Sequence, residues 1–334
     1  MQKYPLISYV IPTKDRPEMV DYTLYSLSKQ TNDNFEVILS DNYDMDSCKY
    51  IFDKYNNRNF KYYNPGSNLS MCDHWEFAIS KANGSYISLI SDKYMVYSFA
   101  TEQMANIINL HSPDIISCSI DRTFPIEDIS KIGFYGFDKK RNPEFYDAKD
   151  ELKRIRNDVW GNFDDGYSGW FRGKICYGVY KKELVMKIIK RYGHIFPPFS
   201  PDYTSLCLGL SLANKCYDFC KPLMMLCSIK GNGATFVENY DYSLKVLESN
   251  YPNYNPKLFP IPNLDSSAAN LVAFDMYVNC NRTEKFNYKD IDPKILSDHS
   301  LTELNIKAAS MSKNQYDAQL KYLINYARKH DVDL

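Results

Sequence analysis

The sequence predicts an α/β fold in which helices cover both faces of a mostly parallel sheet. Short apolar runs of strand length occur at 6–11, 35–39 and 86–90. Between them lie segments whose apolar residues recur at helical spacing. Strands that alternate with helices indicate βαβ units, and right-handed crossovers between such units give a parallel sheet flanked by helices.

The first strand and helix occupy the segment from residue 6 to residue 27. Residues 6–11 read LISYVI and end at Pro12, which is typical of a buried parallel strand. Pro17 suits the first turn of a helix. Apolar residues then follow at i, i+4 and i+7, namely Val20, Leu24 and Leu27.

The same unit repeats through residue 92. Residues 35–39 (FEVIL) predict a second strand, which is closed by the polar cluster 40–42, and a helix is expected through 48–52. A turn-rich loop at 64–68 precedes a helix from about Ser70 to Ala82. Other predicted elements follow: a strand at 86–90, a strand at 114–120, a strand at 177–180, a helix at 181–191, a helix at 202–214 and a strand at 224–229.

Two stretches lack this regular pattern. Residues 121–170 have no clear periodicity, and we interpret them as a lid or binding loop that recognises the acceptor. From residue 231 onward the sequence predicts a helical C-terminal extension, with a Pro-rich tract at 252–263 and helices near 267–278 and 301–327. The predicted organisation is therefore a first domain over 1–230 and the extension over 231–334.

Charge and cysteine content restrict the function classes. The chain has 40 Lys and Arg against 41 Asp and Glu, so we expect no general attraction to nucleic acid. Its nine cysteines are odd in number and none has CxxC spacing, which favours reduced, buried thiols in the cytoplasm. No secretory leader is recognised, and no run approaches the 18 apolar residues of a membrane span.

Polar residues follow three of the predicted strands. Ligands of open α/β sheets bind beyond the carboxyl ends of the strands. The loops at 12–16, 41–42 and 92–93 should therefore come together.

Four sequence blocks resemble the opening of a family 2 glycosyltransferase with the GT-A fold. They are SYVIPTKDRP at 8–17, NFEVILSDN at 34–42, the residues Asn68 and Trp75, and GSYISLISD at 84–92. With the segment SPDYT at 200–204, the resemblance covers roughly residues 5–230. It implies that 1–230 is a catalytic domain that transfers a sugar from a nucleotide-sugar donor.

The expected reaction inverts the configuration at the anomeric carbon of the sugar. The resemblance implies a UDP-sugar as donor and a growing glycan or lipid-linked glycan as acceptor, in the synthesis of a bacterial capsule or lipopolysaccharide.

Donor binding is expected at the ends of the first two strands. An ionised carboxylate offers two strong acceptor oxygens for a base edge or ribose hydroxyls, and Asp41 is the candidate, with Pro12, Thr13 and Arg16 on the same wall. The resemblance adds Asp15 and Asn68 to the donor site. Two alternatives stay open: Asp41 caps the helix that follows it, and Asp15 caps the first helix.

The family's metal motif, an Asp-x-Asp-like cluster, is incomplete in this sequence. Asp92 matches it, but Lys93 stands where a second acid is usual. Either Asp92 still binds Mg²⁺ or Mn²⁺ together with the diphosphate, or the Lys93 ammonium neutralises part of the phosphate charge. A surface Asp-Lys pair without a function is the third interpretation.

The remaining candidates concern the acceptor and the diphosphate. Asp202 resembles the family's general base, although its place at a helix start also suits capping. Tyr167 and Trp170 would stack on an acceptor sugar, or pack in the core. Lys230, in the loop KGNGAT, would close over the diphosphate, or belong to an ordinary loop.

A second function class competes with the enzyme. Because the acidic pair is broken, the chain could be a catalytically inactive nucleotide-sugar or glycan-binding module. The C-terminal helices have an amphipathic pattern that would allow a homodimer or peripheral contact with the inner face of the membrane.

Overall fold

The computed structural model describes residues 5–123, 142–157, 172–197, 199–227, 236–251, 253–275 and 291–334. Within these ranges nine strands form one sheet in the order β3-β2-β1-β4-β8-β6-β9-β5, with β7 paired to β9. The strands are β1 (Ile7–Thr13), β2 (Phe35–Asp41), β3 (Phe60–Tyr63), β4 (Tyr86–Leu89), β5 (Tyr94–Val96), β6 (Ile115–Thr123), β7 (Glu144–Tyr146), β8 (Gly178–Lys181) and β9 (Cys216–Cys227).

The sheet is parallel where the sequence pattern is most regular. β1 pairs in parallel with β2 and β4, and β2 pairs in parallel with β3. β6 and β9 are also parallel, whereas β8 runs antiparallel to β4 and β6, and β5 and β7 run antiparallel to β9. The α/β class with a helix-flanked sheet is confirmed.

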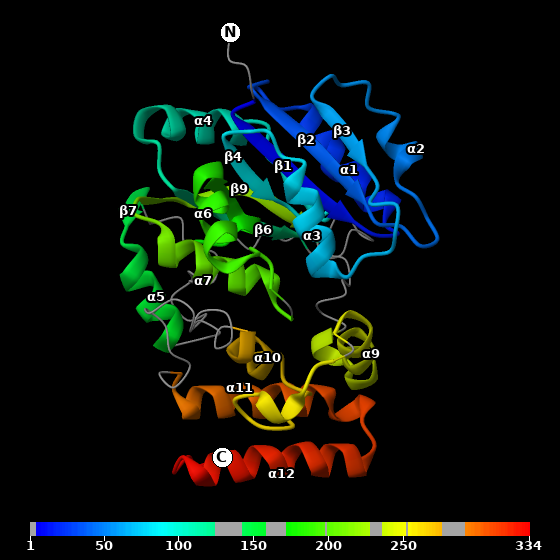
Figure 1. Cartoon of the computed structure of the whole chain (residues 1–334), viewed down its shortest axis with the longest axis vertical. Coiled ribbons are helices and arrows are strands. Elements are labelled where there is room, and N and C mark those ends of the chain that lie inside the picture. The colour runs from blue at the N-terminus through cyan, green and yellow to red at the C-terminus, as the bar shows by residue number, and fades with distance from the viewer. Residues whose placement is uncertain are drawn as a thin grey trace.

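The helices cover the sheet and extend below it (Figure 1). In the sheet-bearing part they are α1 (Pro17–Ser28), α2 (Lys49–Phe52), α3 (Met71–Ser80), α4 (Ala100–His111), α5 (Ala148–Asn157), α6 (Lys182–Tyr192) and α7 (Pro201–Leu212). In the C-terminal part they are α9 (Tyr240–Asn250), α10 (Ala268–Asp275), α11 (Pro293–Lys307) and α12 (Lys313–Lys329). α9 and α10 lie between the sheet and the pair formed by α11 and α12.

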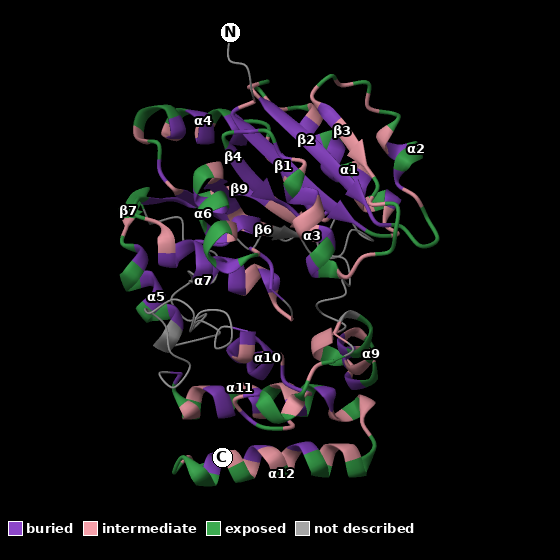
Figure 2. Ribbon diagram, in the orientation of Figure 1, coloured by how far each residue is buried: buried purple, intermediate pink, exposed green. Residues whose placement is uncertain are grey.

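Alternation along β1 divides the core into two clusters, one on each face of the sheet. Val10 belongs to the cluster that contains residues of α6 and α7, whereas Tyr9 and Ile11 belong to the cluster with residues of α1 and α4. All seven residues of β1 are buried, as Figure 2 shows for the central strands. Burial on both faces explains why this strand is apolar at nearly every position rather than at alternate ones.

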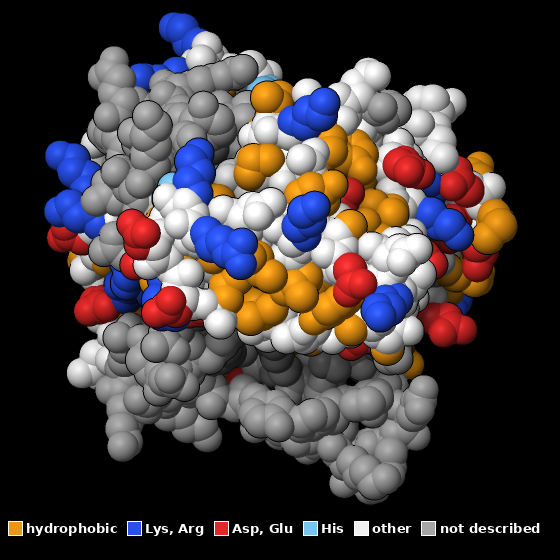
Figure 3. Space-filling view, turned by 90° about the horizontal axis from the view of Figure 1, so that it is seen from below, with side chains coloured by type: hydrophobic (Ala, Val, Ile, Leu, Met, Phe, Trp, Pro, Cys, Tyr) orange, Lys and Arg blue, Asp and Glu red, His pale blue; other side chains and the backbone are white. Residues whose placement is uncertain are grey.

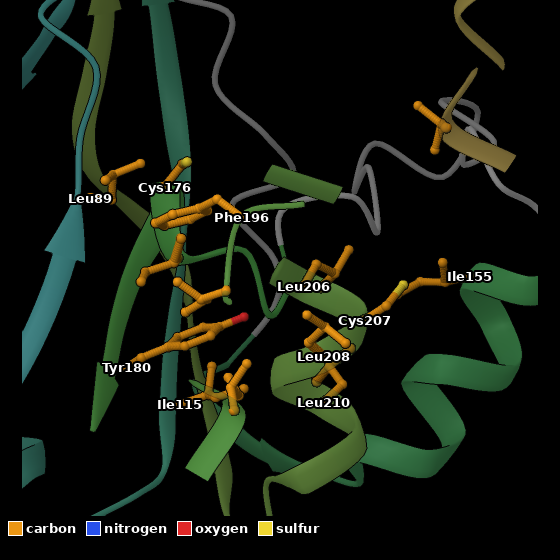
Figure 4. Packing of buried hydrophobic residues seen from close by; sticks show 14 of the residues in the cluster. Leu89, Ile115, Ile155, Cys176, Tyr180, Phe196, Leu206, Cys207, Leu208 and Leu210 are labelled. Atoms are coloured by element: carbon orange, nitrogen blue, oxygen red, sulfur yellow. The ribbon is translucent and has the colours of Figure 1, made fainter. Parts of the chain in front are cut away.

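Helix α7 packs closely on the sheet, where Tyr180 of β8 faces it (Figure 4). The Tyr180 hydroxyl donates to the carbonyl of Gly173 at 2.5 Å and lies 3.1 Å from the Ser205 carbonyl. A Cβ added to Gly209 would lie 2.4 Å from the Tyr180 hydroxyl oxygen. The close approach of α7 therefore depends on glycine at this position, and most of the helix is buried.

Several predicted elements need correction. The predicted helix at 301–327 is two helices, α11 and α12, which are separated by a turn where Ser312 forms a capping box with Gln315. The interval 121–170, interpreted as aperiodic, contains β7 and α5. The strand predicted at 224–229 is the end of the longer β9. Helices α4 and α9 were not predicted.

The C-terminal face mixes hydrophobic side chains with Lys and Arg (Figure 3). On α12 the exposed cations are Lys313, Lys321, Arg328 and Lys329. In the described part of the chain, no helix combines the length and apolar character needed to cross a membrane. Membrane contact, dimerisation and the domain boundary at 230 remain predictions.

Candidate functional site

The carboxyl ends of β1 and β2 bring the first predicted residues together. Thr13 and Asp41 are paired in register at the last position of the two strands, and Pro12 is buried one position earlier, opposite Ser40. The backbone N–H of Asn42 donates to the Thr13 carbonyl at 3.0 Å. The register therefore fixes the two loops side by side, as predicted.

The two oxygens of the Asp41 carboxylate have different surroundings. Oδ2 accepts hydrogen bonds from the Tyr62 hydroxyl at 2.8 Å, the Cys48 backbone N–H at 2.8 Å and the Ser47 hydroxyl at 3.1 Å. Oδ1 is buried and has no hydrogen-bond partner among the described residues. Burial raises the pKa of Asp41 above its ordinary value, although these donors oppose it. Asp41 is not the N-cap of α2, which is Cys48. Its protein partners therefore occupy one oxygen and leave an acceptor at the other.

Asp92 joins the same group from the loop after β4. Its Oδ2 accepts from the Thr13 hydroxyl at 2.8 Å, and its Oδ1 accepts from Arg16 at 3.3 Å and from the Ser91 hydroxyl at 3.1 Å. The Asp92 side chain is 4% exposed and that of Arg16 is 25% exposed. The structure thus brings Thr13, Arg16 and Asp92 into direct contact.

Positive charge accumulates beside Asp92. Lys93 follows it in the chain and is half-buried. Burial lowers the pKa of Lys93, and the nearby Arg16 guanidinium lowers it further, while Asp92 opposes the shift. Two cations next to one carboxylate make this loop suitable for an anion such as a diphosphate.

Asp15 holds the neighbouring loop. Its Oδ1 accepts from the backbone N–H groups of Asp44, Met45 and Asp46, each at 3.0 Å. Burial raises the pKa of Asp15, but these three bonds outweigh it and lower the pKa overall. The N-cap of α1 is Arg16, so the capping alternative for Asp15 is wrong.

Asn68 lies at the exposed rim of this group. Its Oδ1 accepts from Lys14 Nζ at 2.9 Å, and the same ammonium pairs with Asp44 at 2.7 Å. This bond ties the loop that contains Asn68 to the loop after β1.

Asp202 belongs to a second group. It is in the first turn of α7, and its Oδ2 accepts from Lys174 Nζ at 2.9 Å. The side chain of Lys174 is 3% exposed and that of Asp202 is 31% exposed, so the pair is buried on the lysine side and open on the carboxylate side. Burial lowers the pKa of Lys174, but Asp202 and the rings of Tyr203 and Tyr177 outweigh it, so the pKa lies above its ordinary value. Asp202 is not the N-cap, which is Ser200.

Two aromatic rings connect the groups around Asp92 and Asp202. Tyr94, two residues after Asp92, has its ring centroid 5.9 Å from that of Tyr177. Lys174 Nζ lies 5.6 Å from the Tyr177 ring centroid and 3.4 Å from that of Tyr203. The contacts run from the strand-end loop to Asp202 through Tyr94, Tyr177 and Lys174.

We next consider which described side chains could bind a metal ion. No group of three His, Cys, Asp or Glu residues suited to a metal occurs in the ranges that the structure describes. Both oxygens of Asp92 already accept hydrogen bonds from protein donors. The described residues therefore do not form a protein-built metal site.

The residues at the strand ends lie in a segment that is similar to a known protein family. Residues 8–160 match the sequence model of glycosyl transferase family 2. This part of the chain is therefore similar to glycosyl transferase family 2. We found no significant match among curated protein sequences. The matched segment covers the loops that carry Thr13, Asp41 and Asp92.

Solved structures show the same fold at low identity. The crystal structure of S. aureus TarS 1-349 in complex with UDP-GlcNAc is 14% identical, with a TM-score of 0.59 over 97% of this chain and 81% of that chain. The TarS 1-349 complex with UDP is 16% identical, with a TM-score of 0.53 over 98% of this chain and 88% of that one. The likeness extends beyond the family 2 match into the C-terminal part.

Some family 2 candidates cannot be placed, and some site residues were not predicted. Tyr167, Trp170 and Lys230 lie outside the described residues. Tyr62 and Lys174 contact candidate acids, and Tyr177 contacts Tyr94 and Lys174. None of the three was predicted, because nothing in their local sequence distinguishes them. Only the pairing of distant segments reveals them.

Proposed function

We propose that the protein is an inverting glycosyltransferase that moves a sugar from a UDP-sugar to a hydroxyl of a glycan acceptor. The observation that carries this proposal is the meeting of Thr13, Asp41 and Asp92 at the carboxyl ends of the strands, within the family 2 segment. Similarity to TarS, which has been crystallised in complex with UDP-GlcNAc and with UDP, supports uridine as the nucleoside.

Asp41 would hold the nucleoside of the donor, and the basic loop would hold its diphosphate. Asp41 Oδ1 lacks a partner among the described residues, so an N–H or O–H of the nucleoside would satisfy it. Arg16 and Lys93 would bind the diphosphate oxygens. The remaining predicted residues, Pro12, Asp15 and Asn68, would shape the wall and loops around the nucleoside.

Asp202 would act as the general base. It removes the proton from the acceptor hydroxyl while that oxygen forms a bond to the anomeric carbon. The bond from that carbon to the phosphate oxygen breaks, and UDP leaves with the electron pair, its charge stabilised by Arg16 and Lys93. Lys174 holds one oxygen of the Asp202 carboxylate in an ion pair at 2.9 Å, and the open side of the carboxylate allows an acceptor to approach.

The acceptor and the biological role are proposed on the family resemblance. A growing glycan or lipid-linked glycan of a bacterial capsule or lipopolysaccharide would present the attacking hydroxyl. Tyr167 and Trp170 would stack on its sugar, and Lys230 would close over the diphosphate.

A divalent cation would bind only together with the donor. Mg²⁺ commonly takes one or two carboxylates plus phosphate and water, so Asp92 alone would supply the protein ligand. We expect UDP release from UDP-GlcNAc, measured with and without EDTA, to persist at a substantial level because Arg16 and Lys93 already carry positive charge. Complete loss that Mn²⁺ restores would contradict this expectation.

The variant Asp202→Asn tests the assignment of the base. We expect UDP release from UDP-GlcNAc to fall by about 10² to 10⁴ in kcat, because proton transfer is lost. The Kd for UDP, measured by calorimetry, should stay within about twofold, because Asp202 does not touch the nucleotide loops. Asp317→Asn, on the exposed side of α12, is the matched control.

Two outcomes would argue against the proposal. Equal loss of turnover and UDP affinity in Asp202→Asn would remove Asp202 from the role of base. Tight UDP binding by the wild-type chain without turnover of any nucleotide sugar would favour the inactive binding module, which the replacement of the second acid by Lys93 supports.

A further inference from the structure

The segment that leads into α7 contains an unusual backbone conformation. Phe199 has φ +74°, in the left-handed region that bulky residues rarely adopt. Asp202 follows only three residues later, in the first turn of the helix. Strained residues of this kind persist where the surrounding structure holds them, and they cluster at functional sites.

Aromatic side chains of the C-terminal part surround the Phe199 ring. Four rings have centroids within 6.3 Å of it, the nearest at 4.4 Å. They are Tyr251, Tyr254, Phe259 and Phe274. Ring pairs at these separations contribute stabilisation beyond the area they bury, so this aromatic cluster can hold Phe199 in place.

Asp275, the last residue of α10, fixes the next position. Its Oδ2 accepts from the backbone N–H of Ser200 at 2.5 Å, and Ser200 is the N-cap of α7. Asp275 is 1% exposed, and burial raises its pKa well above the ordinary value. In Figure 1, α10 lies directly between α7 and α11, which agrees with this contact.

Helix α3 holds the other end of the segment. Glu76 Oε1 accepts from the backbone N–H groups of Ile195 at 2.6 Å and Phe196 at 2.7 Å. Cys72 Sγ donates to the Pro197 carbonyl at 3.5 Å and lies 3.2 Å from the Tyr251 hydroxyl. The segment is therefore held by the family 2 part on one side and by the C-terminal part on the other.

We propose that Phe199 and Asp275 are positioning residues through which the C-terminal part aims Asp202 at the acceptor hydroxyl. This inference rests on the proposed role of Asp202. Phe199 and Ser200 fix the direction in which α7 begins, and both are held by the C-terminal part. The inference therefore makes the C-terminal part necessary for turnover. Donor binding should not depend on it, because the nucleotide loops belong to β1, β2 and β4.

A double-mutant cycle with Asp202→Asn tests the inference. We expect Phe199→Ala to lower kcat for UDP release from UDP-GlcNAc by about tenfold to a hundredfold, with the Kd for UDP changed less than about twofold. In the Asp202→Asn background the same change should cost less than about twofold, because the residue it positions is already disabled. Equal losses in both backgrounds would overturn the inference.

Asp275 offers a conservative pair of variants. Asp275→Asn keeps an acceptor for the Ser200 N–H and should retain most of kcat, whereas Asp275→Leu should lose about tenfold or more. Leu323→Ala, in the buried face of α12, controls for lost packing in the C-terminal part. Should Leu323→Ala lower kcat as much as Asp275→Leu at equal melting temperature, positioning by Asp275 would be rejected.

Hydrogen exchange separates this inference from the proposed function. Phe199→Ala should speed exchange of the amides at 200–204 by about tenfold or more while leaving those of β1 unchanged. This readout needs no turnover, so it tests the positioning even if the wild-type chain proves inactive. Unchanged exchange at 200–204 would overturn the inference, whereas absence of wild-type turnover would overturn the proposed function.

Discussion

The two ends of strand β2 use a buried carboxylate in opposite ways. At the amino end, Glu36 accepts hydrogen bonds from Lys61 Nζ, the Ser8 hydroxyl and the Asn83 N–H, each at 2.6 Å, and from the Gly84 N–H at 3.2 Å. At the carboxyl end, the donors to Asp41 all reach Oδ2 and all are neutral.

The pKa values follow this difference. Burial raises the pKa of Glu36, but Lys61 and the other donors outweigh it and bring the pKa below the ordinary value. Burial raises the pKa of Asp41 and is not outweighed. A carboxylate with full partners stabilises the fold, whereas a buried carboxylate oxygen without a partner is a candidate for binding a ligand. We therefore expect the two ends of one strand to separate stability from function.

The largest expected effect is on stability at the amino end. Glu36→Ala should lower the free energy of unfolding by about 3 kcal/mol, because four donors, one of them charged, lose their acceptor. Urea denaturation at pH 7 measures it. The control is Asp33→Ala, which breaks an exposed pair with Arg58 and should cost less than about 0.5 kcal/mol. Similar losses in both variants would erase the distinction between the two ends of β2.

A change at the carboxyl end should affect binding instead. Asp41→Asn should weaken UDP binding about tenfold or more, because a charged acceptor is lost, while the melting temperature stays the same or rises. Calorimetric titration and thermal unfolding measure the two quantities. Asp53→Asn, at the exposed end of α2, is the control. A fall in melting temperature with unchanged affinity would make Asp41 a structural residue like Glu36.

The smallest expected effect is on the pH dependence of stability. The pKa of Glu36 is lower in the folded state than its ordinary value of 4.5, so its contribution is present above pH 4.5 and is lost as pH falls through the folded pKa. Glu36→Gln should therefore flatten the loss of stability in that acid range. Asp41→Asn should steepen it, because protonation of wild-type Asp41 stabilises the folded state. If the free energy of unfolding of both variants changed with pH in the same way, the opposite effects expected here would be contradicted.

Elements whose structure depends on neighbouring residues could be predicted from the sequence. The run LISYVI is buried on both faces and Pro17 starts a helix, so β1 and α1 were predicted close to their observed bounds. The contact of Thr13 with Asp92 follows from parallel register, because strand ends in one sheet share an edge.

Contacts between residues far apart in the sequence could not be predicted. Lys174 and Asp202 are 28 residues apart, and neither neighbourhood indicates the other. β3 and β5 have only four and three residues, too few for a clear alternation. The division of 301–327 into two helices was missed, although Ser312 and Gln315 have the S-x-x-Q spacing of a capping box.

The burial of α7 has a consequence for how new specificities could arise. The helix is anchored through Gly209 against Tyr180, so interior packing, together with the contacts of the segment before the helix, fixes the position of Asp202. If Asp202 is the base, as we propose, exchanges in the loops around the substrates could alter which sugar or alcohol is accepted without disturbing proton removal.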